Sequence, residues 1–110
     1  IAYLFATLAG ISKVGSYTGN GSSQTINCGF SSGSAYVLIK RTDATGGWHA
    51  FDSARGIVAG NEQAIVYNDA SKEDGTDSID PANSGFIVNQ NTTTNLNVSS
   101  GTYIFYAISA

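Results

Sequence analysis

Short runs of alternating apolar and polar residues recur along the chain, separated by clusters of turn formers. Tyr, Phe, Val, Ile and Thr, which are enriched in β-strands, supply most of these runs. No run keeps a 3.6-residue period, so we expect little or no helix. The pattern predicts an all-β fold, an antiparallel two-sheet sandwich or jelly roll of about nine short strands. The predicted strands are Ile1–Leu8, Ile11–Tyr17, Gln24–Cys28, Tyr36–Thr42, Trp48–Ser53, Ala64–Tyr67, Gly85–Asn89, Asn95–Ser99 and Thr102–Ser109.

The clearest hairpin lies between Tyr36 and Gly56. Two predicted strands there flank Asp43-Ala44-Thr45-Gly46-Gly47, a run of turn formers. The segment also holds three of the five basic residues, the only Trp and the only His. It is therefore either a core hairpin or a binding face. Alternation along the strands predicts that three of its side chains face the core: Val37, Ile39 and Phe51.

The last predicted strand differs from the others. Thr102–Ser109 is a nearly continuous apolar run instead of an alternating one. Such a run favours a strand that is buried on both sides, or one that lies at an interface.

The first ten residues allow two interpretations. Tyr3-Leu4-Phe5-Ala6 is similar to Tyr103-Ile104-Phe105-Tyr106-Ala107 near the other end of the chain. The first strand could close a preceding copy of the domain, or both could be central strands of one sheet. We therefore expect an N-terminal strand in residues 1–10, which could end a preceding module, and a single β-sandwich domain in residues 11–110. Because the chain begins with Ile, we interpret it as a piece of a longer protein.

Composition limits the class of partner. Charged residues make up only 12% of the chain, and its net charge of −3 argues against nucleic acid, which needs a basic surface. No apolar run approaches the roughly 18 residues of a membrane helix, so we expect no membrane insertion. The single cysteine, Cys28, cannot form an internal disulfide and is expected to be a small buried apolar residue.

Residues for a catalytic site are sparse. His49 is the only imidazole and lies in the middle of a predicted strand, where packing on one face explains it. Asp52 is the only acid inside a predicted strand, so a second carboxylate for glycoside hydrolysis would have to come from a loop. We therefore predict no enzymatic activity. Asp52 and Arg55 are better explained as an ion pair that fixes the exit of the hairpin.

Aromatic residues are the main candidates for ligand binding. Trp48 and Tyr67, with His49 beside Trp48, could form a carbohydrate-binding surface, because exposed aromatic rings stack on sugars. In a small β core, however, most aromatic side chains fill space.

The segment Asn68–Pro81 holds five of the eight acidic residues and is expected to be a surface loop. Asp74, Asp77 and Asp80 are weak candidates for Ca²⁺ ligands, because their spacing matches no EF-hand loop. Solvated surface charge explains them better, so we expect no metal or cofactor.

Five motifs follow one another along the chain and together resemble one protein family: YTGNG, CGF, VLIKRTD…GGW…FDSARG, SGF and TYIF. Between about residue 14 and residue 110, the chain resembles an uncharacterised β domain of large virion proteins of tailed bacteriophages, notably marine ones. The resemblance implies a sandwich of the concanavalin or laminin-G type, found in tail fibres, tail-tip proteins or head-decorating proteins. Relatives often carry a similar module upstream, which favours Ile1–Leu8 as the last strand of a preceding module.

The resemblance implies a non-enzymatic structural module on the surface of a virion. It would contact copies of itself, as a trimer in fibre proteins, and other virion proteins. One alternative is a carbohydrate-binding module that attaches the particle to a host-surface glycan, and another is a repeat of a secreted cell-surface adhesin. Glycan binding predicts an exposed Trp48 or Tyr67 beside polar side chains in a concavity. A structural role predicts buried rings and an apolar patch at a subunit contact.

Overall fold

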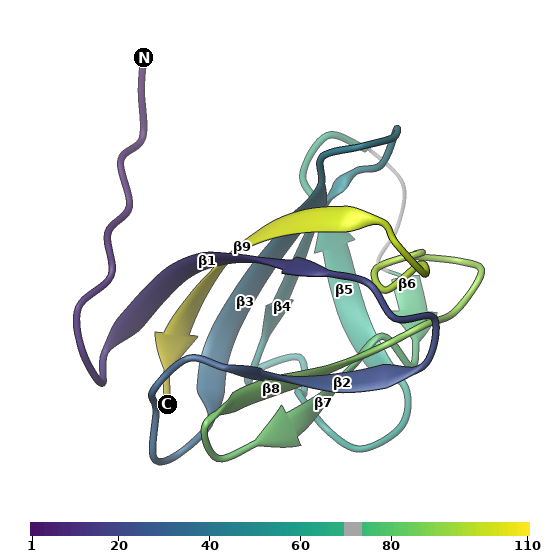
Figure 1. Cartoon of the computed structure of the whole chain (residues 1–110). Coiled ribbons are helices and arrows are strands. Elements are labelled where there is room, and N and C mark those ends of the chain that lie inside the picture. Colours follow the sequence, from purple (N-terminus) through teal and green to yellow (C-terminus); the bar gives the residue numbers. More distant parts are fainter. Residues whose placement is uncertain (70–73) are drawn as a thin grey trace.

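The computed structural model describes residues 1–69 and 74–110, apart from the side chain of Asp74. These residues contain nine strands in two antiparallel sheets and no helix, so none of them forms a helix that could cross a membrane (Figure 1). The all-β, two-sheet sandwich predicted from the sequence is therefore confirmed. The larger sheet has the order β1 (Ser12–Thr18), β9 (Thr102–Ser109), β3 (Ser34–Arg41), β4 (Trp48–Asp52), β5 (Glu62–Val66) and β6 (Asp74–Thr76). The smaller sheet has the order β2 (Ser23–Asn27), β8 (Gly85–Asn89) and β7 (Ile79–Ala82).

The predicted hairpin forms the middle of the larger sheet. Strands β3 and β4 pair with Val37 opposite Phe51 and Ile39 opposite His49, as the turn formers between them require. The last strand, β9, lies between β1 and β3. Its bounds and those of β8 are the predicted ones.

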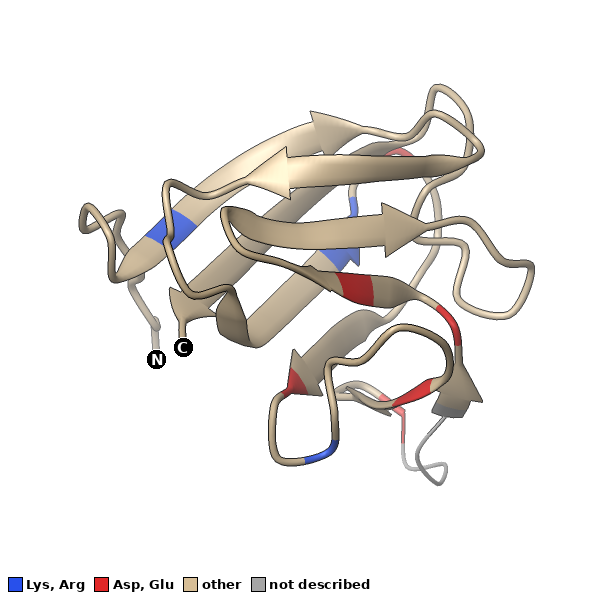
Figure 2. Cartoon of the chain, turned by 90° about the horizontal axis from the view of Figure 1, so that it is seen from below, with Lys and Arg blue, Asp and Glu red and all other residues tan. Residues whose placement is uncertain are grey.

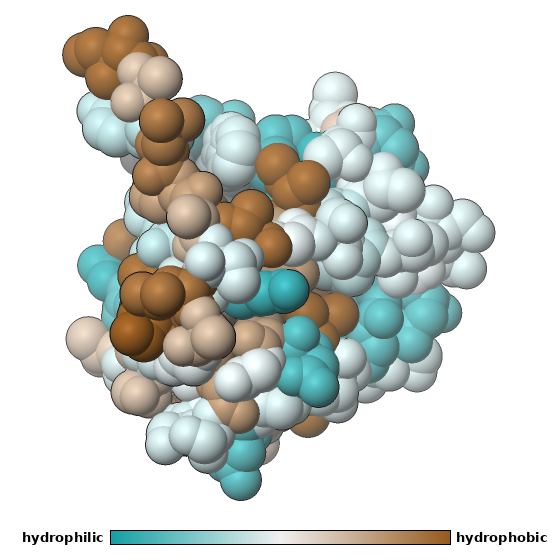
Figure 3. Space-filling model, turned by 60° about the vertical axis from the view of Figure 1, so that its left-hand side comes forward, coloured by the Kyte–Doolittle hydropathy of each residue, from teal (hydrophilic) through white to brown (hydrophobic). Residues whose placement is uncertain are grey.

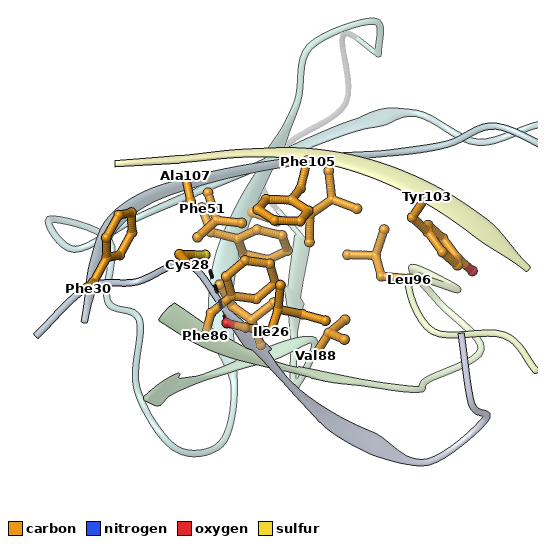
Figure 4. Packing of buried hydrophobic residues seen from close by; sticks show 14 residues of the cluster. Ile26, Cys28, Phe30, Phe51, Phe86, Val88, Leu96, Tyr103, Phe105 and Ala107 are labelled. Atoms are coloured by element: carbon orange, nitrogen blue, oxygen red, sulfur yellow. Dashed lines mark hydrogen bonds between the residues drawn. The ribbon is translucent and has the colours of Figure 1, made fainter. Parts of the chain in front are cut away.

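The core lies between the two sheets and is built from aromatic and aliphatic side chains (Figure 4). The ring of Phe105 in β9 meets the ring of Phe86 in β8 edge to face, with 5.4 Å between centroids. A Cβ atom at Gly15 would lie only 2.8 Å from the Phe105 ring, so glycine leaves room for this ring. The other members of the core cluster are Ile26, Cys28, Phe30, Val37, Ile39, Phe51, Ala64, Ile79, Val88, Leu96, Tyr103 and Ala107.

The residues predicted for the core are found there. Val37, Ile39 and Phe51 are fully buried. Cys28 is also buried, and its burial raises the pKa of the thiol to about 11. The thiol therefore stays protonated at neutral pH and acts as a small apolar side chain.

Residues 1–7 form an extended segment and no strand in this structure (Figure 1). A single bridge joins Leu8 to Ser12. Beyond it, the hydroxyl of Thr7 accepts the Val14 amide at 3.1 Å, where a continuing hairpin would use a backbone carbonyl. The predicted strand at Ile1–Leu8 is thus absent within this chain, while its pairing in a preceding module stays a prediction. We call residues 1–8 the N-terminal arm.

The expected loop at Asn68–Pro81 was wrong over its second half. The backbone of β6 pairs with β5, and β7 pairs with β8, so both are edge strands. Ile79 is fully buried, while Pro81 is tolerated because an edge strand needs no donor on its free side. The turn-forming composition of this segment therefore marks sheet edges as well as a loop.

The predicted strand at Asn95–Ser99 was also wrong, because tertiary contacts hold this segment in turns. Asn97 is fully buried and its amide donates to the carbonyls of Ser22 and Val88. The hydroxyl of Tyr17 donates to the carbonyl of Leu96 at 2.6 Å. These side chains satisfy backbone groups that would otherwise need a neighbouring strand.

We expect Phe86→Ala to lower the free energy of unfolding by about 3–5 kcal/mol, because it leaves a cavity under Phe105. The matched control is Val58→Ala in the exposed loop after β4, which should change stability by less than about 0.5 kcal/mol. Urea unfolding curves of both variants measure the difference. Equal effects of the two substitutions would contradict the assignment of the core.

Candidate functional site

The outer face of the larger sheet carries a patch of apolar side chains, with Lys40 opposite Trp48 and Ile104, and the smaller sheet packs against the other side. Side chains alternate along a strand, so Leu38 of β3 and Ile104 and Tyr106 of β9 point away from the core. Together with Val14 of β1 and Trp48 of β4 they form what we call the outer apolar face. Val14 and Ile104 are each 42% exposed, and Trp48 is 38% exposed. An exposed apolar patch of neighbouring side chains is characteristic of an interaction site.

A hollow of about 470 Å³ lies over the outer apolar face. Its sides include Tyr3 and Phe5 of the N-terminal arm, and Phe5 stacks on Tyr106 with 4.4 Å between ring centroids. Figure 3 shows the apolar arm standing beside further apolar surface of the body. The described lining contains no charged and no amide side chain. The hollow therefore suits an apolar partner.

The structure separates the three residues proposed for carbohydrate binding. Trp48 lies on the outer face, whereas its neighbour His49 turns inward and is only 7% exposed, with Nδ1 3.2 Å from the carbonyl oxygen of Gly47. Tyr67 is exposed, and its hydroxyl pairs with that of Tyr36 at 2.7 Å. The Tyr67 amide also donates to the Trp48 carbonyl. Only Trp48 and Tyr67 can therefore share a surface.

Asp52 and Arg55 come together at the end of the hairpin. One carboxylate oxygen of Asp52 accepts the Arg55 amide at 2.8 Å, and the other accepts the guanidinium at 2.6 Å. Partial burial acts to raise the pKa of Asp52, but these hydrogen bonds and the positive charge outweigh it and lower the pKa. The pair closes the turn after β4, and both carboxylate oxygens of Asp52 accept hydrogen bonds from Arg55.

Most of the acidic residues lie towards one end of the molecule (Figure 2). Asp77 and Asp80 approach one another there, and each accepts a hydrogen bond from the amide of Asn89. Asp74, the third weak metal candidate, has a side chain outside the described residues. Among the side chains that are described, no three acidic, His or Cys residues lie close enough to hold a metal ion.

A buried carboxyl group near this end was not predicted from the sequence. Glu62 is only 2% exposed, and its Oε1 accepts the amides of Ser78 and Ile79. Its Oε2 has no partner in the described structure. The hydroxyl groups of Ser78 and Thr94 form a hydrogen bond of 2.7 Å beside this carboxyl group. Glu62 lies just before a predicted strand. No feature of the sequence indicated that its side chain would bind the segment around residue 78.

Burial raises the pKa of Glu62 to about 7, although the two backbone hydrogen bonds act to lower it. The nearby charges of Asp77 and Asp80 raise it further. The folded protein therefore keeps the Glu62 proton to a higher pH than the unfolded chain does.

The fold and this surface define an all-β, two-sheet sandwich with an uncovered apolar sheet face. Over residues 1–110 the chain matches the model of a family described as Domain of unknown function (DUF7483), and it belongs to that family. No curated protein and no solved structure matches the chain.

The stability of the protein should fall as the pH rises from about 4.5, the ordinary pKa of Glu62, to about 7, its value in the folded protein. The folded state holds a proton there that the unfolded state has lost, so each pH unit lowers stability by up to about 1.4 kcal/mol. Glu62→Gln should remove this contribution, and urea unfolding at several pH values measures it. Acids such as Asp43, whose pKa its partner Arg41 and the Thr102 amide lower to about 2, titrate below this window. An identical pH dependence in both proteins would contradict the assignment.

Proposed function

We propose that the chain is a non-enzymatic structural module of a bacteriophage virion protein, exposed on the particle and in contact with copies of itself. The observation that carries the proposal is the outer apolar face with its hollow. Exposed aromatic and aliphatic side chains on a sheet face are stabilised when a second apolar surface covers them. The virion setting rests on the resemblance of the sequence motifs to phage virion domains.

The polar groups described in the structure support a role without catalysis. His49 faces the core side of its strand, and Asp52 is paired with Arg55. Glu62 is only 2% exposed, so its carboxyl group offers almost no surface to a substrate. None of these groups lines the hollow over the outer apolar face.

The surroundings of Trp48 favour subunit contact over carbohydrate binding. Trp48 is exposed, as a glycan site requires, but its neighbours in the hollow are Leu38, Ile104 and Tyr106. Sugar recognition needs a few placed polar groups to orient the hydroxyls, and the described lining has no carboxylate, amide or cation. An apolar partner surface matches the described lining of the hollow better than a sugar does.

We expect the chain to form oligomers that Ile104→Lys dissociates, because a charge would be buried against the partner's apolar face. Val58→Lys, at an aliphatic residue of similar exposure outside the face, should leave the oligomer intact. Sedimentation equilibrium of the three proteins measures their masses. A monomer for the unchanged chain, or equal masses for both lysine variants, would contradict a contact through this face.

The virion setting has its own experiment. Antibodies against the chain, coupled to gold, should label intact particles produced by the genome that encodes it. Electron microscopy shows the position of the label, and mass spectrometry of purified particles serves as the control for presence. Absence of the polypeptide from purified particles would overturn the virion proposal. Glycan-array binding that Trp48→Ala abolishes, in a monomeric chain, would replace subunit contact with the carbohydrate-binding function.

A further inference from the structure

The N-terminal arm exposes an unusual amount of apolar surface. Tyr3 is 80% exposed, Leu4 is 93% exposed and Phe5 is 55% exposed, although Phe5 already stacks on Tyr106. Side chains of this kind are normally buried, and in the arm they follow one another without a charged residue. The arm therefore has a strong tendency to cover more apolar surface than it does within one chain.

The edge of the larger sheet beside the arm is open to a further strand. Strand β1 is the end of the sheet order, with β9 on its other side. Backbone groups alternate between the two sides of a strand, so Ser12, Val14 and Ser16 direct their amides and carbonyls away from β9. The arm uses this edge at Ser12 and Val14 only, and then leaves it. Open strand edges of this kind pair readily with another chain.

A tight turn joins the arm to β1. The amides of Ile11 and Ser12 both donate to the Leu8 carbonyl, and the Leu8 amide donates to the Ser12 carbonyl. Gly10 has a φ of 74°, a backbone conformation that glycine adopts in such a turn without strain. Exchange of the arm between copies therefore has to open the bonds between Leu8 and Ser12.

We propose that the N-terminal arm of one copy lies on the outer apolar face and β1 edge of a second copy. This inference rests on the proposed function, since it uses the same face as the subunit contact. The arm is placed against that face already, because Phe5 and Tyr3 line the hollow with Trp48 and Ile104. When the arm moves to a partner, the same contacts form between the two chains, so the exchange costs little free energy. A second body on the face would also cover the parts of the arm that one chain leaves exposed.

The dimensions and the charge agree with this arrangement. Eight extended residues span roughly 26–29 Å, and the seven residues of β1 span roughly 23–24 Å. One arm can therefore run along the β1 edge of a partner beside the outer apolar face. The described lining of the hollow contains no charged side chain. Lys40, which stands opposite Trp48 and Ile104, donates its ammonium group to the Arg41 carbonyl at 2.9 Å.

A mixture of two single-cysteine variants tests the exchange between chains. Ala6→Cys places a thiol on the arm and Ser16→Cys places one at the β1 edge, and both changes keep every aromatic residue of the contact. A disulfide between two differently tagged chains can form only in trans. Under mild oxidation we expect several times more of the mixed dimer than in a mixture of Ala6→Cys with Val58→Cys. Cys28 does not interfere, because it is buried and its thiol stays protonated.

The mass of an arm variant in solution shows whether arm exchange or only the face contact of the proposed function is correct. Tyr3→Ser combined with Phe5→Ser should dissociate the oligomer as Ile104→Lys does. An oligomer that the Ile104→Lys change dissociates and the arm variant does not, with no excess of mixed disulfide, would overturn arm exchange and leave the face contact standing. A chain that is monomeric in every form would overturn both.

Discussion

The two-sided character of the larger sheet is the constraint on which the rest of the structure depends. A strand directs alternate side chains to opposite faces, and six strands make a broad surface on each side. The three strands of the smaller sheet cover one of these sides and form the core with Phe86 and Val88. The described part of the chain has no other layer, so Trp48, Leu38 and Ile104 are left uncovered. The candidate site is thus a direct result of the architecture.

Hydrogen bonds of side-chain amides and hydroxyls fix the loops of this protein, whereas ion pairs do so in many other proteins. Among the described residues there are two ion pairs, Arg41–Asp43 and Arg55–Asp52, and both stay close to the β3–β4 hairpin. In the segment before β9, the buried side chain of Asn97 binds two turns and β8 together. An amide both donates and accepts, so one buried Asn can satisfy several backbone groups of an irregular segment. The low charge of the sequence is therefore consistent with a well-fixed structure.

The apolar outer face links the physical description to the function. A ligand site for a small polar molecule needs polar groups placed around the ligand, and the described lining of the hollow has no charged or amide side chain. The nearly continuous apolar pattern of β9 follows from the same fact: Phe105 faces the core, while Ile104 and Tyr106 face outward. Such a strand suits a protein whose second sheet face is covered by another molecule, which is the basis of the proposal of a structural module.

The sequence by itself determined the class of fold, the β3–β4 hairpin, the core positions Val37, Ile39 and Phe51 and the Asp52–Arg55 pair. These features are local, because alternation, turn formers and a spacing of three residues are visible in a short window. Tertiary structure alone decided that Ile1–Leu8 is an arm, that Asn95–Ser99 is a set of turns and that Glu62 is buried. Each depends on partners distant in sequence, such as Tyr106 for the arm, Ser22 for the turns and Ser78 for Glu62. The long apolar run of Thr102–Ser109 allowed either burial on both sides or an interface, and only the arrangement of the two sheets showed which of its faces is uncovered.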